Sequence, residues 1–535
     1  MDQLRSIDAG VLAMETSRAP AHSGLLTIFE PLRRGRPLTA DDVTAVLAER
    51  LHLMPPLRRR LAEVPLGLDR PYWFEDPDFD LDFHVRRTGL PSPGTDAQLA
   101  ELVARVHARP LDRSRPLWEL YVVEGLPGGR TAQFTKIHHA AIDAATGMDL
   151  MSALLDTSRT PDPVEPAAVP WSPDRRPGPG EMLTRAVTSM AARPRVARRM
   201  ARPLMSALVG AAGQQLPPLL QTVREVLERV PGVRELPGLR GDSGSDSSRD
   251  PDAPGRPGLI APRTSFNQRI TEHRRVAFCT LDFDEIHRVR DAFGVTVNDV
   301  ILAVCAGALR SWLGDRRELP TDPLLALVPV SVRDESDATA AGGRRGPAAD
   351  SRISAVVTAL ATHEPDPRRR IALIAAAAAE SRRSLDALPA SLLADISAFT
   401  SPALASLAAR AVASTKISNI ANPPFNLVIT NVPGAQQPLW CAGARQVATY
   451  AIPVVNDGVG LHITAMSYDG NVHVGAVACR ELMPDLWGLV DRIPVALAEL
   501  RALSTPRRPA APGTTRTRTT RKVTTQEDTS HGRTA

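Results

Sequence analysis

The sequence predicts a mixed α/β fold built as two domains of similar size. Its 535 residues exceed what one ordinary hydrophobic core organises, so two domains are expected. Strand-like alternation and helix-like periodicity occur together in two stretches of the chain, separated by a proline-rich, low-complexity stretch. We therefore expect an N-terminal domain at 1–160, a linker at 161–263, a C-terminal domain at 264–505 and a disordered basic tail at 506–535.

Three segments of the first domain justify its assignment. Residues 39–57 favour a helix that starts at Thr39, because threonine is a preferred residue at helix N-termini. Residues 119–126 and 131–138 are rich in β-branched and aromatic side chains and predict two strands. The Gly128-Gly129 pair between them is typical of a turn, so the two strands should form a hairpin.

The linker changes in composition along its length. It begins proline-rich, continues with helix-like segments that are interrupted at Pro194, Pro203 and Pro217, and ends in a Ser/Asp/Gly-rich run. Strand and helix patterns return after it, at 274–283 (strand), 298–313 (helix), 425–434 (strand and turn) and 460–477 (hairpin about Asp469-Gly470). The second domain is therefore also expected to mix helices and strands.

The net charge of +5 arises in the tail, where seven arginines and lysines stand against Glu527 and Asp528. Since the rest of the chain is neutral, nucleic-acid binding is not expected. The first residues lack a basic stretch followed by an apolar one, and no apolar run approaches the ~18 residues of a membrane span, so a cytoplasmic location is expected. Four widely spaced cysteines predict buried thiols and no zinc site, namely Cys279, Cys305, Cys441 and Cys479.

Several kinds of catalysis lack their motifs. The nearest match to a serine-hydrolase elbow is "GDSGS" at 241–245, which lies in the low-complexity linker, where no rigid scaffold holds a nucleophile. Neither the H-E-x-x-H zinc motif nor a glycine-rich nucleotide loop occurs. Proton transfer by histidine remains, and "TAQFTKIHHAAIDA" at 131–144 is the segment that suits it.

His138 and His139 end a predicted strand, so their side chains should point to opposite faces, one toward a cleft and one into the core. Imidazole titrates near pH 6.5, so its neutral form is available to take a proton from an attacking hydroxyl. Asp143 either holds a histidine or an arginine in place, or caps the helix predicted after it. Packing is the alternative role for the histidine pair.

The segment "HHAAIDA" at 138–144 resembles the HHxxxDG motif of the acyltransferase superfamily that includes chloramphenicol acetyltransferase and peptide-synthetase condensation domains. Further blocks resemble, in order, those of the bacterial wax ester synthase/diacylglycerol acyltransferase family. These blocks are "AMETSRAPAHSGLLTIFE", "PYWFEDPDFDLDFHV", "PLWELYVVEGL", "TVNDVILAVCAGALRSWL", "VPVSVRDE" and "NPPFNLVITNVPGAQQPLWCAGA". The resemblance implies two chloramphenicol acetyltransferase-like domains with a tunnel at their interface.

By the same resemblance, acyl-CoA and a hydrophobic alcohol, either diacylglycerol or a long-chain fatty alcohol, are the substrates. His139 is then the general base, with His138 and Asp143 as further members of the site and Asp143 mainly organising the loop. A thioester is already activated, so a base suffices and neither a cofactor nor a metal is expected.

Six further residues are candidates for substrate contact near the tunnel: Asn298, Asp299, Asn431, Pro433, Gly434 and Trp118. Each has a structural alternative. Asn298 and Asp299 suit the start of a helix, the Asn-Val-Pro-Gly segment suits a turn, and Trp118 suits a packed wall.

Two departures from the family pattern affect the expected function. Ala144 stands where the motif has glycine, and Gln268 and Arg269 stand where glycine and proline are more familiar. Ala144 is harmless if its backbone is helical and costly if positive φ is required. A condensation-domain-like enzyme and a non-catalytic lipid-binding relative therefore remain as alternatives.

The segment from Met182 to Arg224 contains no acidic residue, while its arginines are interspersed with apolar side chains. Such a pattern favours contact with an anionic membrane or a lipid droplet. The alternative is a bridging helix that packs its apolar face across both domains and leaves its arginines in solvent.

Overall fold

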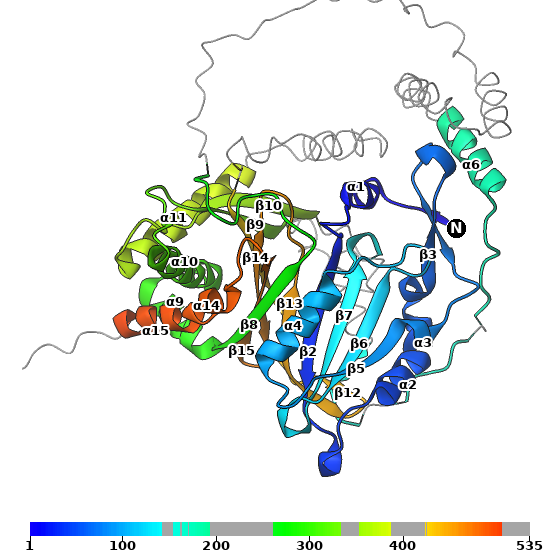
Figure 1. Cartoon of the computed structure of the whole chain (residues 1–535), viewed down its shortest axis with the longest axis horizontal. Helices are drawn as coiled ribbons and strands as arrows, with labels where there is room; N and C mark the ends of the chain where they lie inside the picture. Colours follow the sequence, from blue (N-terminus) through cyan, green and yellow to red (C-terminus); the bar gives the residue numbers. More distant parts are fainter. Residues whose placement is uncertain are drawn as a thin grey trace, which may run out of the picture.

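The computed structural model describes residues 1–141, 154–160, 163–168, 171–192, 261–332, 352–386, 423 and 425–504. It confirms the mixed α/β class, with two six-stranded mixed sheets and helices packed on them (Figure 1). Asp143, Ala144, most of the linker and the tail lie outside the described residues, so the predictions made for them stay predictions.

The first sheet has the strand order β12-β13-β2-β7-β6-β5. Its members are β2 (His22–Phe29), β5 (Val85–Gly89), β6 (Trp118–Glu124), β7 (Thr131–His138), β12 (Trp440–Cys441) and β13 (Ala444–Ile452). The predicted hairpin is confirmed: β6 and β7 are antiparallel, and Gly128 and Gly129 have positive φ in the turn between them. The central strand β7 pairs on its other side with β2, which sets His22 opposite His138.

Four helices accompany this sheet, namely α1 (Ser6–Met14), α2 (Ala40–Arg50), α3 (Leu81–His84) and α4 (Asp96–His107). Thr39 caps α2 through a reciprocal bond with Asp42, as its sequence position predicts. The helix is shorter than the predicted 39–57, because the chain passes into 3-10 turns at Leu51–Leu53 and at Pro55–Arg58. Proline lacks the N–H that would continue the helix.

The second sheet has the order β10-β9-β11-β14-β15-β8. Its strands are β8 (Arg274–Asp282), β9 (Leu325–Val332), β10 (Arg352–Ala359), β11 (Leu427–Val432), β14 (Leu461–Tyr468) and β15 (Asn471–Cys479). Its helices are α9 (Phe283–Phe293), α10 (Val297–Asp315), α11 (Pro367–Asp386), α14 (Leu486–Val490) and α15 (Arg492–Ser504). The hairpin turns at Asp469-Gly470, as predicted, with positive φ at both residues.

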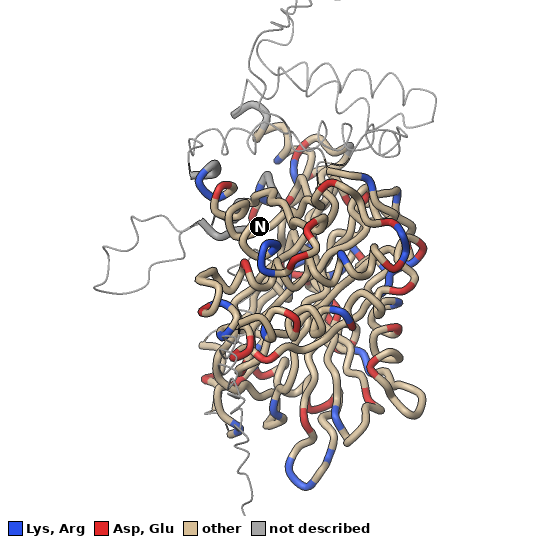
Figure 2. Tube along the Cα trace, turned by 90° about the vertical axis from the view of Figure 1, so that its left-hand side faces the viewer, with Lys and Arg blue, Asp and Glu red and all other residues tan. Residues whose placement is uncertain are grey.

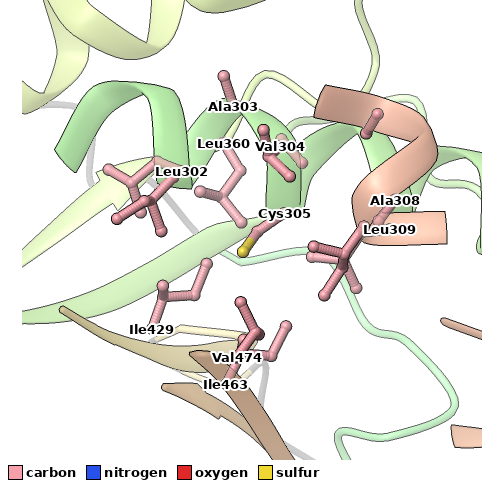
Figure 3. Packing of buried hydrophobic residues seen from close by; sticks show 14 of the residues in the cluster. Leu302, Ala303, Val304, Cys305, Ala308, Leu309, Leu360, Ile429, Ile463 and Val474 are labelled. Atoms are coloured by element: carbon pink, nitrogen blue, oxygen red, sulfur yellow. The ribbon is translucent and has the colours of Figure 1, made fainter. Parts of the chain in front are cut away.

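The helix α10 is the centre of the C-terminal core. Side chains of α10, among them Leu302 and Cys305, lie over Ile429, Ile463 and Val474 of the sheet (Figure 3). Among the described helices, α10 alone has the length and mean hydropathy of a membrane span, but most of it is buried inside the protein. This burial is the environment of a core helix, and it explains why its residues are apolar on nearly every side.

A small third sheet, β1-β4-β3, lies at the N-terminal end and is formed by β1 (Asp2–Gln3), β4 (Tyr72–Glu75) and β3 (Arg59–Ala62). The helix α6 (Pro179–Ala192) packs Met182, Leu183 and Ala186 against this sheet (Figure 1). The described part of the arginine-rich segment therefore turns its apolar face toward the N-terminal half. Basic and acidic positions are interspersed along the described trace (Figure 2).

The two halves of the chain are interlocked by a strand exchange. Residues 440–452 form β12 and β13, which extend the first sheet because β13 pairs with β2. The chain then returns to the second sheet as β14. A division of the chain near residue 264 therefore does not coincide with the division between the sheets. One core cluster contains Leu26 and Phe134 from the first half together with Phe278 and Val477 from the second.

Gly475 marks a close approach of the two sheets. A Cβ atom at this position would lie 2.3 Å from the carbonyl oxygen of Ala451 on β13.

We expect Gly475→Ala to destabilise the protein by about 1 to 3 kcal/mol, because the backbone of β13 must move. Thermal melts check this expectation, with Gly10→Ala as the control, since Gly10 lies within α1 and has no atom within 4 Å of its Cβ position. Equal melting temperatures for the native protein and the Gly475→Ala variant would contradict it.

Candidate active site

The end of β7 separates the two adjacent histidines. His138, the last residue of β7, is 1% exposed, whereas His139, the first residue of the following 3-10 turn, is exposed. The backbone N–H of Ala140 donates to Nδ1 of His138 at 3.0 Å, which fixes the proton of this ring on Nε2. Nε2 in turn lies 3.5 Å from a carboxylate oxygen of Glu15. His138 is therefore held by polar partners inside the protein.

Glu15 supports this arrangement from the end of α1. Its carboxylate accepts from Arg113 Nε at 3.1 Å and from the backbone N–H of Ala21 at 3.3 Å. Burial alone would raise the pKa of Glu15, but His138 and Arg113 lower it to about 2. The ionised carboxylate ties α1 to the segment before β2 and to the buried histidine.

His139 presents the accessible imidazole of the site. Its backbone N–H donates to the carbonyl of Ala21 at 3.0 Å, and its Nε2 lies 2.9 Å from the hydroxyl oxygen of Ser23 on β2. Desolvation, with a smaller effect of charge on His138, lowers the pKa of His139 to about 4. The ring is accessible from solvent, but the surrounding protein removes much of its hydration. It is therefore neutral at physiological pH and available to a ligand.

A further histidine, His462 on β14, was not predicted from the sequence. Its Nδ1 lies 3.0 Å from the carbonyl oxygen of Val454, and its Nε2 lies 2.9 Å from the hydroxyl of Thr430 on β11. Burial, with a smaller effect of charge on His139, lowers the pKa of His462 to about 4. Val454 follows Pro453, whose carbonyl accepts from His107 of the first half, so His462 is linked to the histidines of that half through the crossover from β13. No flanking motif marks His462, which occupies an ordinary strand position.

Of the two candidates at the start of α10, Asp299 makes contacts that shape the helix. Asp299 is 3% exposed, and its carboxylate accepts from the N–H of Thr296 at 2.9 Å and from its hydroxyl at 2.7 Å. Thr296 caps the helix and Asp299 completes the capping box, while Asn298 is half-buried in the first turn. Asp299 thus has the helix-capping role that was the alternative to substrate contact.

The Asn-Val-Pro-Gly segment ends β11 and shapes the turn after it. Asn431 lies two residues after Ile429 in the strand, so both side chains are on the face of the sheet that packs under α10. Pro433 is exposed. At Gly434 a Cβ atom would lie 2.1 Å from the carbonyl oxygen of Ser467, so only glycine fits there. Asn431 therefore lies on the opposite face of β11 from Thr430.

Trp118 lies on β6 next to the end of β7, the strand that leads to the two histidines. It is 3% exposed, donates its indole N–H to the carbonyl of Leu57 at 2.8 Å, and stacks on His84 with ring centroids 4.5 Å apart. A buried ring that is satisfied in this way supports β6 and β7 and presents no face to a ligand. The packed-wall alternative therefore describes Trp118.

A cavity of about 460 Å³ lies elsewhere, at the entry to the second half, and is lined by Arg263, Thr264, Ser265, Gln268 and Glu318. Gln268, one of the departures from the family pattern, thus faces a cavity that contains none of the histidines. Within the described residues no three His, Cys, Asp or Glu side chains are grouped so as to hold a metal ion. Three of the cysteines are buried free thiols, and Cys279 is partly buried.

The fold and the site define a class of protein: a two-part α/β protein with a neutral, accessible histidine at the end of a central strand, next to a hydroxyl and without a described nucleophile elbow. Models of two domains match the chain, the wax ester synthase/diacylglycerol acyltransferase catalytic domain over residues 4–301 and the C-terminal domain of the same family over residues 351–501. The chain belongs to this family and is an O-acyltransferase.

Individual relatives agree with this assignment. The chain is 36% identical over 504 residues to a probable diacylglycerol O-acyltransferase of Mycobacterium tuberculosis (strain H37Rv), with 94% of this chain and 99% of the relative covered. It is 30% identical over 496 residues to the O-acyltransferase WSD of Acinetobacter baylyi, covering 92% and 95%. The solved wax ester synthase/diacylglycerol acyltransferase of Marinobacter aquaeolei VT8 superposes with a TM-score of 0.62 at 26% identity, covering 94% and 100%.

The lowered pKa of His139 predicts how activity depends on pH. A general base works only when it is unprotonated, so a pKa of about 4 keeps His139 active as the pH falls from 7 to about 5. The acidic limb of kcat/KM should have its midpoint about 4, not near the ordinary histidine value of about 6.5. Initial rates across this range, with tryptophan fluorescence to show that the protein stays folded, measure the limb. A midpoint near 6.5 would contradict the desolvated environment of the ring.

Proposed function

We propose that this protein transfers a long-chain acyl group directly from acyl-CoA to the hydroxyl of diacylglycerol or of a long-chain fatty alcohol, with His139 as the general base. One observation carries the assignment of the base: the neutral, exposed ring of His139 already lies 2.9 Å from a hydroxyl, that of Ser23. A substrate hydroxyl at such a distance is within reach for proton transfer.

In the proposed reaction the hydroxyl proton of the acceptor passes to His139 as the oxygen attacks the thioester carbonyl carbon. The tetrahedral intermediate then collapses, the C–S bond breaks, and the sulfur of CoA takes the proton back from the imidazolium. The products are the ester and free CoA. Because the thioester supplies the activation, this route needs no cofactor and no acyl-enzyme.

His138 is a positioning residue in this proposal. Its ring is held by the N–H of Ala140 on one side and faces Glu15 on the other, so it fixes the backbone from which His139 projects. The backbone N–H of His139 is itself bonded to Ala21. Precise placement of a base increases the rate, because the base and the substrate hydroxyl are then already held in the geometry for proton transfer.

We also propose that the protein lies in the cytoplasm and makes peripheral contact with a membrane or a lipid droplet, since both proposed substrates are hydrophobic. The support is the arginine-rich sequence up to Arg224. The described part of that segment, α6, packs on the small sheet, so the proposed contact involves the sequence beyond Ala192. Co-sedimentation with anionic vesicles tests this proposal, and equal binding to neutral vesicles would contradict it.

Replacing each histidine in turn distinguishes the general base from the residue that positions it. We expect His139→Ala to lower turnover by about 10²- to 10⁴-fold with an unchanged melting temperature, because the lost group is exposed and acts as the base. His138→Ala should lower the melting temperature, because it removes a buried ring and leaves the Glu15 carboxylate without one of its partners. The assay measures ester formation from a long-chain acyl-CoA with diacylglycerol, with a fatty alcohol and without an acceptor. Near-normal turnover by folded His139→Ala protein would overturn the assignment of the base.

A further inference from the structure

The hydrogen bonds of His462 determine where its proton lies. A carbonyl oxygen only accepts, so Nδ1 of His462 must donate to Val454 at 3.0 Å. The neutral ring then has only a lone pair at Nε2, which accepts from the hydroxyl of Thr430 at 2.9 Å. The single proton of the Thr430 hydroxyl is therefore bound to His462, and this oxygen can form further hydrogen bonds only as an acceptor.

Strand alternation places this pair on one face of the second sheet. Val428 pairs with His462, and Thr430 follows two residues later on the same face. Both His462 and Thr430 are half-buried. The opposite face, which carries Ile429 and Ile463, is buried beneath α10 (Figure 3). The pair thus faces away from the helices of its own half. Val454, which His462 contacts, follows Pro453, whose carbonyl accepts from His107. The carbonyl of His107 accepts in turn from His22, which lies opposite His138 at the end of β7.

We propose that Thr430 and His462 form a positioning dyad of the acyl-transfer site, in which His462 makes the Thr430 oxygen a hydrogen-bond acceptor for an N–H or O–H donor of a substrate. The dyad extends the function proposed above and rests on it. An oxygen whose proton is bound to His462 does not donate to the thioester oxyanion, so the dyad does not act as an oxyanion hole.

The chemistry of the two substrates indicates which donor the dyad binds. An alcohol acceptor has one hydroxyl proton at the reacting oxygen, and in the proposed mechanism that proton goes to His139. Acyl-CoA has amide N–H groups in the pantetheine arm close to the thioester. The donor bound by Thr430 is therefore an amide N–H of the acyl-CoA arm.

The test uses two thioesters of the same fatty acid, one with N-acetylcysteamine, which has an amide N–H, and one with ethanethiol, which has none. We expect Thr430→Val to lower kcat/KM for the first about tenfold, the value of one hydrogen bond, and to change the second by less than about twofold. His462→Ala should act in the same direction, and the double variant should be no worse than Thr430→Val alone, because the two residues act as one unit.

The second sheet supplies a matched control. His473 on β15 pairs with Thr280 on β8, with its Nδ1 3.1 Å from the threonine hydroxyl, which also lies 3.0 Å from the hydroxyl of Tyr450. Thr280→Val removes an equivalent His–Thr contact and should leave the ratio of the two kcat/KM values as in the native protein.

Two results would overturn the proposal: equal losses on both thioesters for Thr430→Val, or a ratio for Thr430→Val that matches that of Thr280→Val. Failure of the proposed function gives a different result, since His139→Ala would then retain turnover with both thioesters whatever Thr430→Val does.

Discussion

The crossover between β13 and β14 is the constraint on which the rest of the structure depends. It begins at Pro453, whose carbonyl accepts from Nε2 of the buried His107 at 3.0 Å, and the next carbonyl, that of Val454, accepts from His462. Further along, Asp457 accepts from the N–H of Ile270 at 2.9 Å. Burial lowers the pKa of His107 to about 3, so its ring stays neutral and donates a single N–H. The crossover is thus held from both halves, and it fixes the second sheet, with its Thr430–His462 dyad, against the sheet that carries His139.

The same principles give the histidines of this region different chemistry. His138 and His107 are buried, and their ring nitrogens meet a backbone N–H or a carbonyl, which makes them parts of the scaffold. His139 is exposed and its Nε2 meets a hydroxyl, the group on which an acyltransferase must act. His462 is half-buried and has both nitrogens engaged, so it orients Thr430 and is not free to exchange protons. One imidazole is therefore left for proton transfer within this group.

The sequence was sufficient for features that depend on local pattern. The β6–β7 hairpin, the cap at Thr39 and the helix α10 follow from spacing and from residue types, and so does the expectation that one of the two adjacent histidines is buried and the other is not. It was insufficient where distant segments meet. Nothing near β13 predicts that it pairs with β2, about 420 residues earlier in the chain, because pairing partners are chosen by tertiary packing. Ser23 and His462 were missed for the same reason. Each is an ordinary strand residue until the fold brings it to an imidazole or a hydroxyl. The roles of Asp143 and Ala144 stay predictions.

The contact between Ser23 and His139 also raises the one mechanism that competes with direct transfer. A hydroxyl 2.9 Å from a histidine has the geometry of a nucleophile and its base, so Ser23 is the residue that would carry an acyl-enzyme if the reaction were covalent. In direct transfer the Ser23 hydroxyl does not react, and the hydroxyl of the acceptor alcohol takes its place as the hydrogen-bond partner of His139. The intact mass of the protein after mixing with a long-chain acyl-CoA, without any alcohol, distinguishes the two most directly. Our account predicts an unchanged mass and no stoichiometric release of free CoA. A mass increase of one acyl group that is lost in Ser23→Ala would contradict it.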